Sequence, residues 1–281
     1  MKKWNLIVDV AKCTNCNLCT LANQDEHVDN EFPGYSAPMP RHNHRWIEIR
    51  GRERGHGPVM DVVYLPVMCQ HCDDAPCIKA AQNGAVTKRP DGIVVIDPVK
   101  ARGQRAIADA CPYGAVRWNE ELNLPQHWIF DAHLLDHGWT EPRCVQVCAT
   151  GALKSVKLTD EEMRDLGQRE GLQELQPESA TKPRVHYKNL ARFTHDFIGG
   201  TIVNTVAGVT DCVAGATIRV EQDGRVVGET VTDAFGEFKV DGLEPDSGQY
   251  DVVVEAPGLA ARRLDVELGK SVNIGRIDLA A

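Results

Sequence analysis

Hydrophobic and polar residues alternate most regularly near the C-terminal end of the chain. From about residue 200, runs such as "GEFKVDGL" and "QYDVVVEAPG" place an apolar residue at every second position, which is typical of half-buried β-strands. Asp223-Gly224 separates two further runs of this kind and predicts a tight hairpin. Short strands at regular spacing, with Gly and Pro in the turns, predict a small all-β sandwich or barrel over residues 199–281.

Residues 1–198 have a less regular pattern, with the short strand-like runs "NLIVDV", "GIVVID" and "GAVRW". Residues 159–176 predict a helix, with Thr159 as N-cap and Glu162 completing a capping box. The stretch "KPRVHYKNLARF" after it predicts an extended arm that lies on another surface, so that 159–195 is a helix plus an arm. Residues 26–66 form a long insertion with no obvious secondary structure. Together these patterns predict an α+β domain followed by the β-module.

Composition narrows the possible partners and the compartment. The 281 residues leave room for two domains, and the net charge of −9 argues against nucleic acid as a partner. We expect no membrane span and no export signal, because no apolar run reaches about 20 residues and no apolar signal region precedes the first cysteines. Nine of the ten cysteines lie within the first 148 residues at metal-ligand spacings, which favours metal over disulfides and predicts a cytoplasmic, reducing environment. The tenth, Cys212, is expected to be a small buried hydrophobic residue.

The spacing of the cysteines follows the rule of two-cluster ferredoxins. In a C-x2-C-x2-C-x3-C-P run, the first three cysteines bind one cluster and the fourth binds the other. Under this exchange of fourth ligands, the chain retains two complete sets and predicts two [4Fe-4S] clusters. The first set is Cys13, Cys16, Cys19 and Cys148, and the second set is Cys69, Cys72, Cys77 and Cys111.

The same rule identifies two further sets of positions from which cysteines are missing. Random loss of cysteines would not spare two full sets, so the pattern favours iron–sulfur clusters over zinc. One vacated set is Ala81, Ala101, Gln104 and Ile107, and the other is Asn23, Trp128, Asp131 and the remaining Cys144. Two interpretations of Cys144 stay open. It is a buried relic thiol, or it holds a mononuclear metal or an incomplete cluster with Asp131, His127 and His133.

Several stretches resemble a known family. "CQHCDDAPC", "ACPYGAVRW", "AHLLD" and the late C-x3-C resemble the ferredoxin-like iron–sulfur subunits of molybdenum or tungsten oxidoreductases of the dimethyl-sulfoxide-reductase superfamily. "DEHVDNEFPGYSAPMPRHNHRWIEI", "TKPRVHYKNLARF" and the C-terminal "DCVAGATIRV" and "FGEFKV" resemble small subunits of the pyrogallol–phloroglucinol transhydroxylase family. The C-terminal module is also similar to transthyretin-like β-modules.

The resemblance implies a non-catalytic small subunit. Its partner would be a larger catalytic chain that carries molybdenum (or tungsten) bis-molybdopterin guanine dinucleotide and transfers or adds hydroxyl groups on polyhydroxybenzenes such as pyrogallol or resorcinol. Members of the family usually keep three or four clusters, so the vacated positions predict an interrupted electron path. The alternatives are an electron-transfer subunit of another molybdenum or tungsten reductase or dehydrogenase, and a structural protein whose clusters only stabilise the fold.

The insertion 26–66 is expected to dock the large subunit. It carries Arg45 and Trp46, which are residue types that interfaces favour, and the arm would assist it. The alternative is a flap that covers the chain's own clusters.

Overall fold

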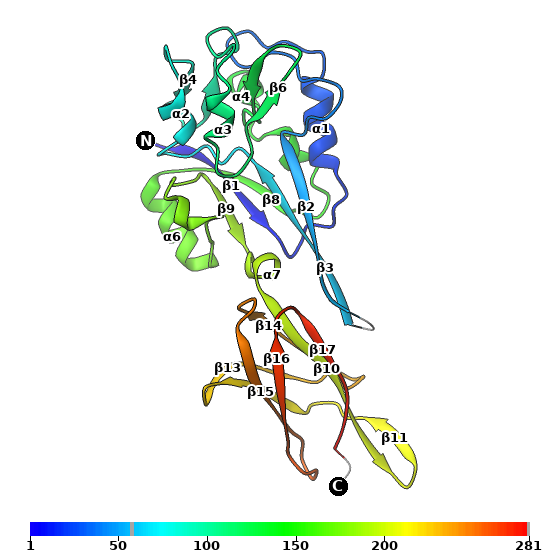
Figure 1. The fold of residues 1–281 in the computed structure, drawn as a ribbon. Helices are drawn as coiled ribbons and strands as arrows, with labels where there is room; N and C mark the ends of the chain where they lie inside the picture. The colour runs from blue at the N-terminus through cyan, green and yellow to red at the C-terminus, as the bar shows by residue number, and fades with distance from the viewer. Residues whose placement is uncertain (57–58, 280–281) are drawn as a thin grey trace. The chain divides into compact units, whose positions relative to one another are not determined.

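The computed structural model describes residues 1–56 and 59–279, so residues 57–58 of the predicted insertion lie outside the described part (Figure 1). The chain forms two compact units. The first consists of Met1–Arg50 and Tyr64–Leu190, and the second of Gly51–Val63 and Ala191–Ala281. The predicted domain boundary after residue 198 stays a prediction. The first compact unit ends at Leu190, and the second unit includes residues 51–63 of the insertion.

A three-stranded sheet forms the base of the first unit. β1 (Lys3–Asp9) lies in the middle, antiparallel to β8 (Leu153–Leu158) and parallel to β9 (Val185–Lys188). Side chains on a strand alternate between two faces, and Ile7 packs against Met163 and Leu166 of the helix α6 (Asp160–Glu170). Figure 1 shows α6 beside this sheet. The run "NLIVDV" is therefore the central strand of the unit.

The helix α6 has the predicted start but ends earlier than predicted. The Glu162 backbone N–H donates to the Thr159 hydroxyl at 3.2 Å, and the Thr159 N–H donates to the Glu162 carboxylate at 2.8 Å, which confirms the capping box. The extension to residue 176 was wrong. Gly171 has φ 62°, a left-handed conformation that glycine adopts without a steric penalty, and it ends the helix.

The segment predicted as a surface arm is part of the fold's own sheet. Val185 and Tyr187 of β9 are fully buried, and the Tyr187 hydroxyl donates to the Pro66 carbonyl at 3.1 Å. The expectation of an arm lying on another surface was wrong. Residues Val185–Lys188 of this segment pair with β1, which lies near the N-terminus of the chain. The arm ends in the short helix α7 (Ala191–Thr194), at the start of the second unit.

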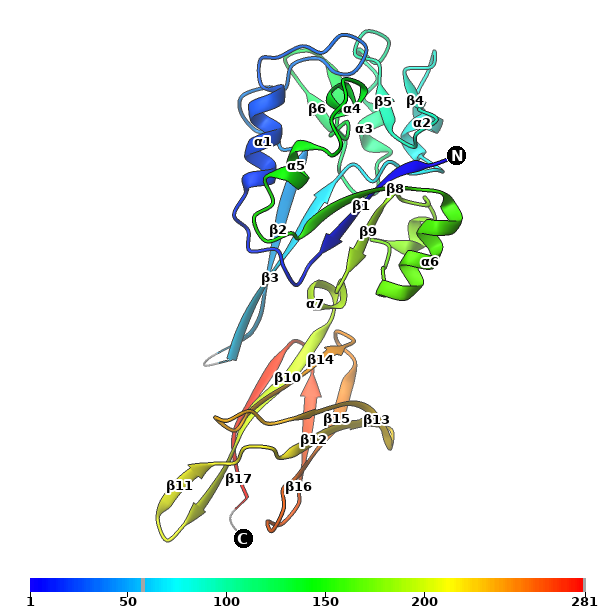
Figure 2. The same cartoon turned by 180° about the vertical axis from the view of Figure 1, so that it is seen from behind.

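The rest of the first unit consists of short elements that carry the cysteine loops. α1 and α5 lie side by side (Figure 2), and β4 with β5 and β6 with β7 form small antiparallel pairs. The elements are α1 (Leu18–His27), α2 (Pro76–Ala80), β4 (Val86–Lys88), β5 (Val94–Ile96), α3 (Ala106–Asp109), β6 (Arg117–Asn119), β7 (Leu124–Gln126), α4 (Ala132–Asp136), α5 (Arg143–Gln146) and the 3-10 turn η1 (Pro177–Ser179).

The insertion contains two long strands that the sequence analysis did not expect. β2 (Ile47–His56) and β3 (Val59–Met68) form a two-stranded sheet. β2 begins in the first unit and ends in the second, and β3 begins in the second unit and ends in the first. The expectation of an insertion without secondary structure was therefore wrong, and alternation was hard to see there because "IRGRERGH" carries four charged residues.

The second unit is the predicted β-sandwich. One sheet has the order β13-β12-β15-β16, and the other combines β11, β10, β14 and β17. Side chains of both sheets share one apolar core, including Ile218 and Val252 from the first sheet and Ile202 and Phe238 from the second. The strands are β10 (Asp196–Val206), β11 (Val209–Cys212), β12 (Thr217–Gln222), β13 (Arg225–Val231), β14 (Glu237–Leu243), β15 (Gly248–Glu255), β16 (Arg262–Leu268) and β17 (Val272–Asp278).

Two details of the sandwich test the sequence predictions. Asp223 (φ 51°) and Gly224 (φ 73°) connect β12 to β13, and Gln222 pairs with Arg225, so the tight hairpin is confirmed. The expectation that Cys212 is buried was wrong. It is exposed, because every residue of the edge strand β11 is exposed.

Charged residues fix the inserted piece Gly51–Val63 within the second unit. The fully buried Arg54 guanidinium donates to Asp241 of β14 at 2.7 Å and to Asp61 of β3 at 2.5 Å. Arg52 donates to both carboxylate oxygens of Asp196 in β10 at 2.9 Å. These ion pairs hold β2 in register, because a shift of the strand would separate the paired groups and leave a buried charge uncompensated.

Candidate metal centres

The first predicted set of cysteines lines one small pocket of the first unit. Cys13 and Cys16 lie in the loop before α1, Cys19 lies in its first turn, and Cys148 follows α5. Cys16 is exposed and Cys19 is buried, whereas Cys13 and Cys148 are half-buried. Apart from the four cysteines, the pocket is lined by Thr14, Ile49, Pro66, Thr150, Ala152 and Leu153.

The backbone of the first loop is shaped for this arrangement. Asn15 (φ 58°) and Asn17 (φ 60°) both adopt the left-handed conformation, which asparagine tolerates better than most residues. The Asn17 side chain donates to the Asn15 carbonyl at 2.9 Å and closes the turn. On the opposite wall, the Leu153 N–H donates to Cys148 Sγ at 3.4 Å. All four thiols of the first set thus belong to residues that line one pocket.

The second predicted set is more deeply placed. Cys69 and Cys72 follow β3, Cys77 lies in α2, and Cys111 follows α3. The first three are buried and Cys111 is half-buried. Interactions between the charges of these cysteines link all four, since Cys111 acts on each of the other three. The structure therefore groups these residues as the sequence rule does.

A charged network that the sequence analysis missed supports the second set. The Lys88 ammonium of β4 donates to the carbonyls of His71 and Cys72 at 2.8 and 2.9 Å and forms an ion pair with Asp73 at 2.8 Å. The buried Arg184 guanidinium also binds Asp73, through Nε at 3.0 Å. No local sequence pattern marks these residues, because the contacts join positions 73, 88 and 184.

The thiols need a cation to become thiolates. Burial, together with the charges of neighbouring cysteines, raises the pKa of Cys19 to about 11 and that of Cys77 to about 12. The pKa values of Cys13, Cys69 and Cys72 are raised as well, again mainly by burial. Metal binding to such sites releases protons, because only the thiolate is a ligand. All-sulfur sets of four, crowded and partly buried, fit an iron–sulfur cluster.

A single ion and a cluster demand different arrangements of four cysteines. Four thiolates around one zinc at about 2.3 Å would lie roughly 3.8 Å apart, whereas a cubane cluster gives each cysteine its own iron. Within residues 1–56 and 59–279, no three or more His, Cys, Asp or Glu side chains form a group that could hold one metal ion.

One vacated set has been closed by apolar packing and hydrogen bonds. Ala101 and Ile107 are fully buried. The Gln104 side chain accepts from the Gln82 N–H at 2.8 Å and donates to the Lys100 carbonyl at 2.7 Å. Glutamine therefore satisfies its amide where a cysteine ligand would stand in a cluster-bearing relative.

The other vacated set is buried but less well satisfied. Asn23, Trp128, Asp131 and Cys144 are all buried. Within the described residues, neither amide atom of Asn23 has a hydrogen-bond partner. Asp131 accepts from the Arg143 N–H at 2.8 Å through Oδ2, and its Oδ1 lies 3.6 Å from Nε2 of the buried His27. Burial and the charges of Asp131, Cys19 and Cys148 raise the pKa of Cys144 well above its usual value. Cys144 is thus a buried neutral thiol next to the first set.

The arrangement does not support the mononuclear metal site at Cys144. His127 contacts the Trp128 carbonyl at 2.6 Å through Nδ1, and His133 contacts Glu26 at 2.8 Å through Nε2. Each ring keeps its other nitrogen for a further contact, but the described residues near Cys144 include no group of three His, Cys, Asp or Glu that could hold one ion. The interpretation of Cys144 as a buried relic thiol agrees with this geometry.

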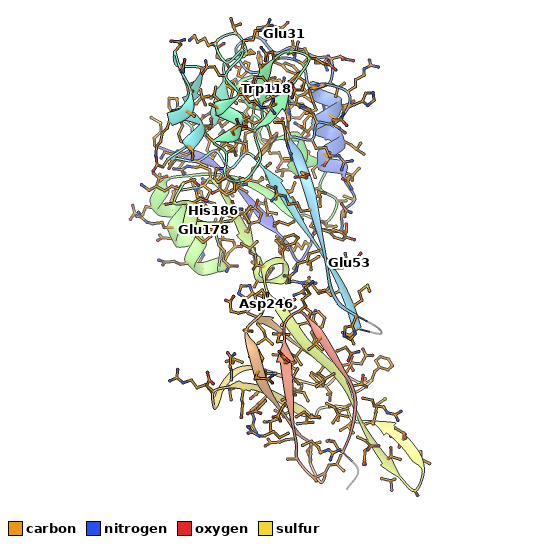
Figure 3. All side chains as sticks on the ribbon, viewed as in Figure 1. Glu31, Glu53, Trp118, Glu178, His186 and Asp246 are labelled. Atoms are coloured by element: carbon orange, nitrogen blue, oxygen red, sulfur yellow. The ribbon has the colours of Figure 1, made fainter. Side chains whose placement is uncertain are left out.

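The insertion presents fewer docking residues than predicted. Trp46 and Met39 are almost fully buried, so the expectation that Trp46 contacts a partner was wrong. Arg45 remains exposed. It lines a pocket together with Arg41, His42 and Arg117. Arg117 precedes Trp118 in β6, and Trp118 is labelled in Figure 3. The exposed residues of the insertion include the basic Arg41 and Arg45 and the acidic Glu31 and Glu53.

Comparison with known proteins decides the family. The chain is 44% identical to the "Pyrogallol hydroxytransferase small subunit" of Pelobacter acidigallici over 99% of this chain and all of that protein. It belongs to the same family of iron–sulfur subunits. It is also 29% identical to a tetrathionate reductase subunit of Salmonella typhimurium over 67% of this chain and 73% of that protein. The predicted relationship to iron–sulfur subunits of the dimethyl-sulfoxide-reductase superfamily is confirmed.

Family models match both parts of this iron–sulfur subunit. Residues 60–158 match the 4Fe-4S dicluster domain, and residues 198–280 match the carboxypeptidase regulatory-like domain. The predicted fold class, a ferredoxin-like domain followed by a transthyretin-like β-sandwich, is confirmed. Among solved structures, 5-hydroxyisourate hydrolase of Klebsiella pneumoniae matches 31% of this chain and 92% of its own, with 14% identity and a TM-score of 0.26. No helix in residues 1–56 and 59–279 is long and apolar enough to span a membrane.

Proposed function

We propose that this chain binds two [4Fe-4S] clusters, one on Cys13, Cys16, Cys19 and Cys148 and one on Cys69, Cys72, Cys77 and Cys111. The support is that each set has four thiols whose charges interact, in the part of the chain where cysteine spacing follows the two-cluster rule. A bound cluster supplies one-electron transfer. The chain's own residues bury the thiols, donate N–H groups to sulfur and hold the loops in place.

Iron and sulfide analysis tests the number of clusters. Anaerobically purified chain should contain about eight iron and eight acid-labile sulfide, four of each per cluster. About twelve of each would mean that Cys144 and its neighbours still hold a cluster. About four would mean that one of the two sets is not a site.

The chain serves as the non-catalytic small subunit of a molybdenum (or tungsten) enzyme that transfers hydroxyl groups on polyhydroxybenzenes. The observation that carries this proposal is the 44% identity over the full length of both chains to a pyrogallol hydroxytransferase small subunit, including the β-module. The active site and the bis-molybdopterin guanine dinucleotide would belong to a larger partner. The clustered free thiols favour a cytoplasmic location for the complex.

Purification of the native complex tests this assignment. An affinity-tagged chain should co-purify with a larger chain that contains molybdenum or tungsten, and the complex should convert pyrogallol when a second polyphenol is supplied. Arg45→Glu should weaken the co-purification while the iron content stays the same, because Arg45 is an exposed basic residue of the insertion. Lys270→Glu, a change of the same charge in the β-module, is the matched control. Unchanged recovery of the large chain in Arg45→Glu would remove this part of the insertion from the docking surface.

A second candidate is an electron-transfer subunit of a reductase or dehydrogenase. It is favoured by the similarity of the iron–sulfur part to the tetrathionate reductase chain. The two candidates differ in electron balance, because hydroxyl transfer between two polyphenols needs no net supply of electrons. Turnover that requires a stoichiometric external donor or acceptor would favour the second candidate.

A further inference from the structure

Thr181 is held beside the second cysteine set by an unusual backbone. Its two neighbours, Ala180 (φ 50°) and Lys182 (φ 51°), are both left-handed although neither is glycine. Such conformations cost on the order of 1–3 kcal/mol each and persist only where the surrounding structure enforces them. Here the Asp73 and Asp74 N–H groups donate to the carbonyls of Lys182 and Thr181 at 2.9 and 3.0 Å. This segment is thereby fixed against the loop that carries Cys72.

The Thr181 side chain belongs to a short hydrogen-bonded chain that ends on a cysteine sulfur. Thr181 and Tyr113 are both buried, and their hydroxyl oxygens lie 2.6 Å apart. The Thr181 side chain also lowers the pKa of Cys72, as a hydroxyl that donates to the sulfur does. A thiolate can only accept, so a bond from Thr181 to a Cys72 thiolate would use the single hydrogen of the hydroxyl. The Tyr113 hydroxyl would then donate to Thr181 Oγ1, in the order Tyr113 to Thr181 to Cys72.

This chain of hydrogen bonds joins the two halves of the second set. Tyr113 comes two residues after Cys111, while the Thr181 segment is hydrogen-bonded to Asp73 and Asp74, directly after Cys72. The Tyr113 carbonyl in turn accepts from the Arg50 guanidinium at 2.9 Å, which holds the segment in place. Donors linked in this way polarise one another, so each strengthens the next in a buried site. At the first set, Cys148 Sγ accepts from the Leu153 backbone N–H at 3.4 Å and lies 3.9 Å from the Thr150 hydroxyl.

We propose that Thr181, supported by Tyr113, is a positioning residue that raises the reduction potential of the cluster on Cys69, Cys72, Cys77 and Cys111. The inference rests on the proposed function, since it requires a cluster at this set. On reduction the cluster gains one electron and no covalent bond or proton needs to change. A hydrogen bond to a ligand sulfur stabilises the more negative, reduced form, and hydrogen bonds to sulfur are among the factors that set cluster potentials.

Redox titration followed by electron paramagnetic resonance tests the proposal. The purified complex, or the full chain where it is stable alone, is titrated anaerobically with dithionite as the electron donor. Thr181→Val, which keeps the shape and removes the hydroxyl, should shift the midpoint of one cluster to a more negative potential and leave the other midpoint unchanged. A tenfold change in the ratio of oxidised to reduced cluster corresponds to about 59 mV for one electron, and we expect a shift of that order.

Two further variants distinguish this effect from a general disturbance. Thr181→Ser retains the hydroxyl and should titrate like the unsubstituted protein. Tyr113→Phe should give a smaller negative shift, because the bond from Thr181 to sulfur remains but is less polarised. Iron analysis of each variant identifies which idea has failed. An unchanged midpoint, or equal shifts of both clusters, in Thr181→Val protein with full iron content would overturn the role of Thr181. About four iron in the unsubstituted protein would instead overturn the assignment of two clusters.

Discussion

The two cysteine sets share one spacing rule but differ in their surroundings. The first set includes the exposed Cys16 and lies in a pocket otherwise lined by small, apolar or hydroxyl side chains. The second set has three buried cysteines and is surrounded by charged and hydroxyl groups from distant positions, notably Lys88, Asp73 and Thr181. The same ligand pattern can thus serve two sites with different solvent access and different electrostatics, and these differences determine stability and potential.

Removing one ligand from each set gives the largest expected effect. Cys77→Ser and Cys148→Ser should each lose about half of the eight iron atoms expected for two clusters. Both should lower the melting temperature, because the bound group contributes directly to folding. Cys77→Ser should lower it more, since the second set lies deeper in the domain. Equal melting temperatures in the two variants would show that burial of the set does not determine its contribution.

The rate of iron loss should distinguish the sets without any substitution. A chelator reaches exposed ligands first, so iron of the first set should be released several-fold faster than iron of the second. The loss can be followed by absorbance, and the same assay on Cys148→Ser protein, which retains only the second set, should lack the fast phase. A fast phase that persists in Cys148→Ser would contradict the role of Cys16 exposure.

The charged network of the second set predicts a dependence on pH. Burial alone would raise the pKa of Asp73, but Arg184 and Lys88 lower it to about 2. Because the folded pKa is below the unfolded value of about 3.9, this stabilisation is fully present above about pH 4 and is lost as the pH falls towards 2. Asp73→Asn should lower the free energy of unfolding at neutral pH by about 1–3 kcal/mol. The difference from the unsubstituted protein should shrink over that acid range.

The neighbouring carboxylate provides a matched control. Asp74 pairs with Lys79 on the surface, so Asp74→Asn should change unfolding little at any pH. If Asp73→Asn and Asp74→Asn behave alike in denaturant titrations, the ion pairs of Asp73 with Arg184 and Lys88 do not stabilise the second set.

The smallest effect is expected at the thiol that belongs to neither set. Cys144→Ser should leave the iron content unchanged and lower the melting temperature slightly, because the hydroxyl is a poorer fit for a buried apolar position. Iron and sulfide analysis is the measurement. Loss of iron from this variant would move Cys144 into the first site and replace the relic-thiol interpretation.

Local patterns predicted the features that depend on neighbouring residues. The Asp223-Gly224 hairpin and the Thr159–Glu162 capping box follow from a few adjacent side chains, and both are present. The grouping of the cysteines follows from spacing, because each loop supplies three ligands from a short segment. The candidate cysteine sets were therefore the part of the molecule that the sequence predicted best.

Contacts between distant positions could not be predicted in this way. The parallel pairing of β9 with β1 brings together residues about 180 positions apart, so a buried strand looked like a surface arm. Thr181 carries no motif, and its position depends on the left-handed backbone at Ala180 and Lys182. Trp46 is a residue type favoured at interfaces, yet it is buried in the fold. Composition alone does not distinguish these two environments.

The inserted hairpin constrains how this chain could have been assembled during evolution. Arg54 is buried with Asp241, so a gene that acquired only the C-terminal module, or only the long β2–β3 hairpin, would leave one of these charges without its partner. A junction after residue 198 would also cut β10, which contains the partner of Arg52. The inserted piece Gly51–Val63 and the module are therefore expected to be gained or lost together, and relatives that lack the module should have a shorter connection between the residues equivalent to Arg50 and Tyr64.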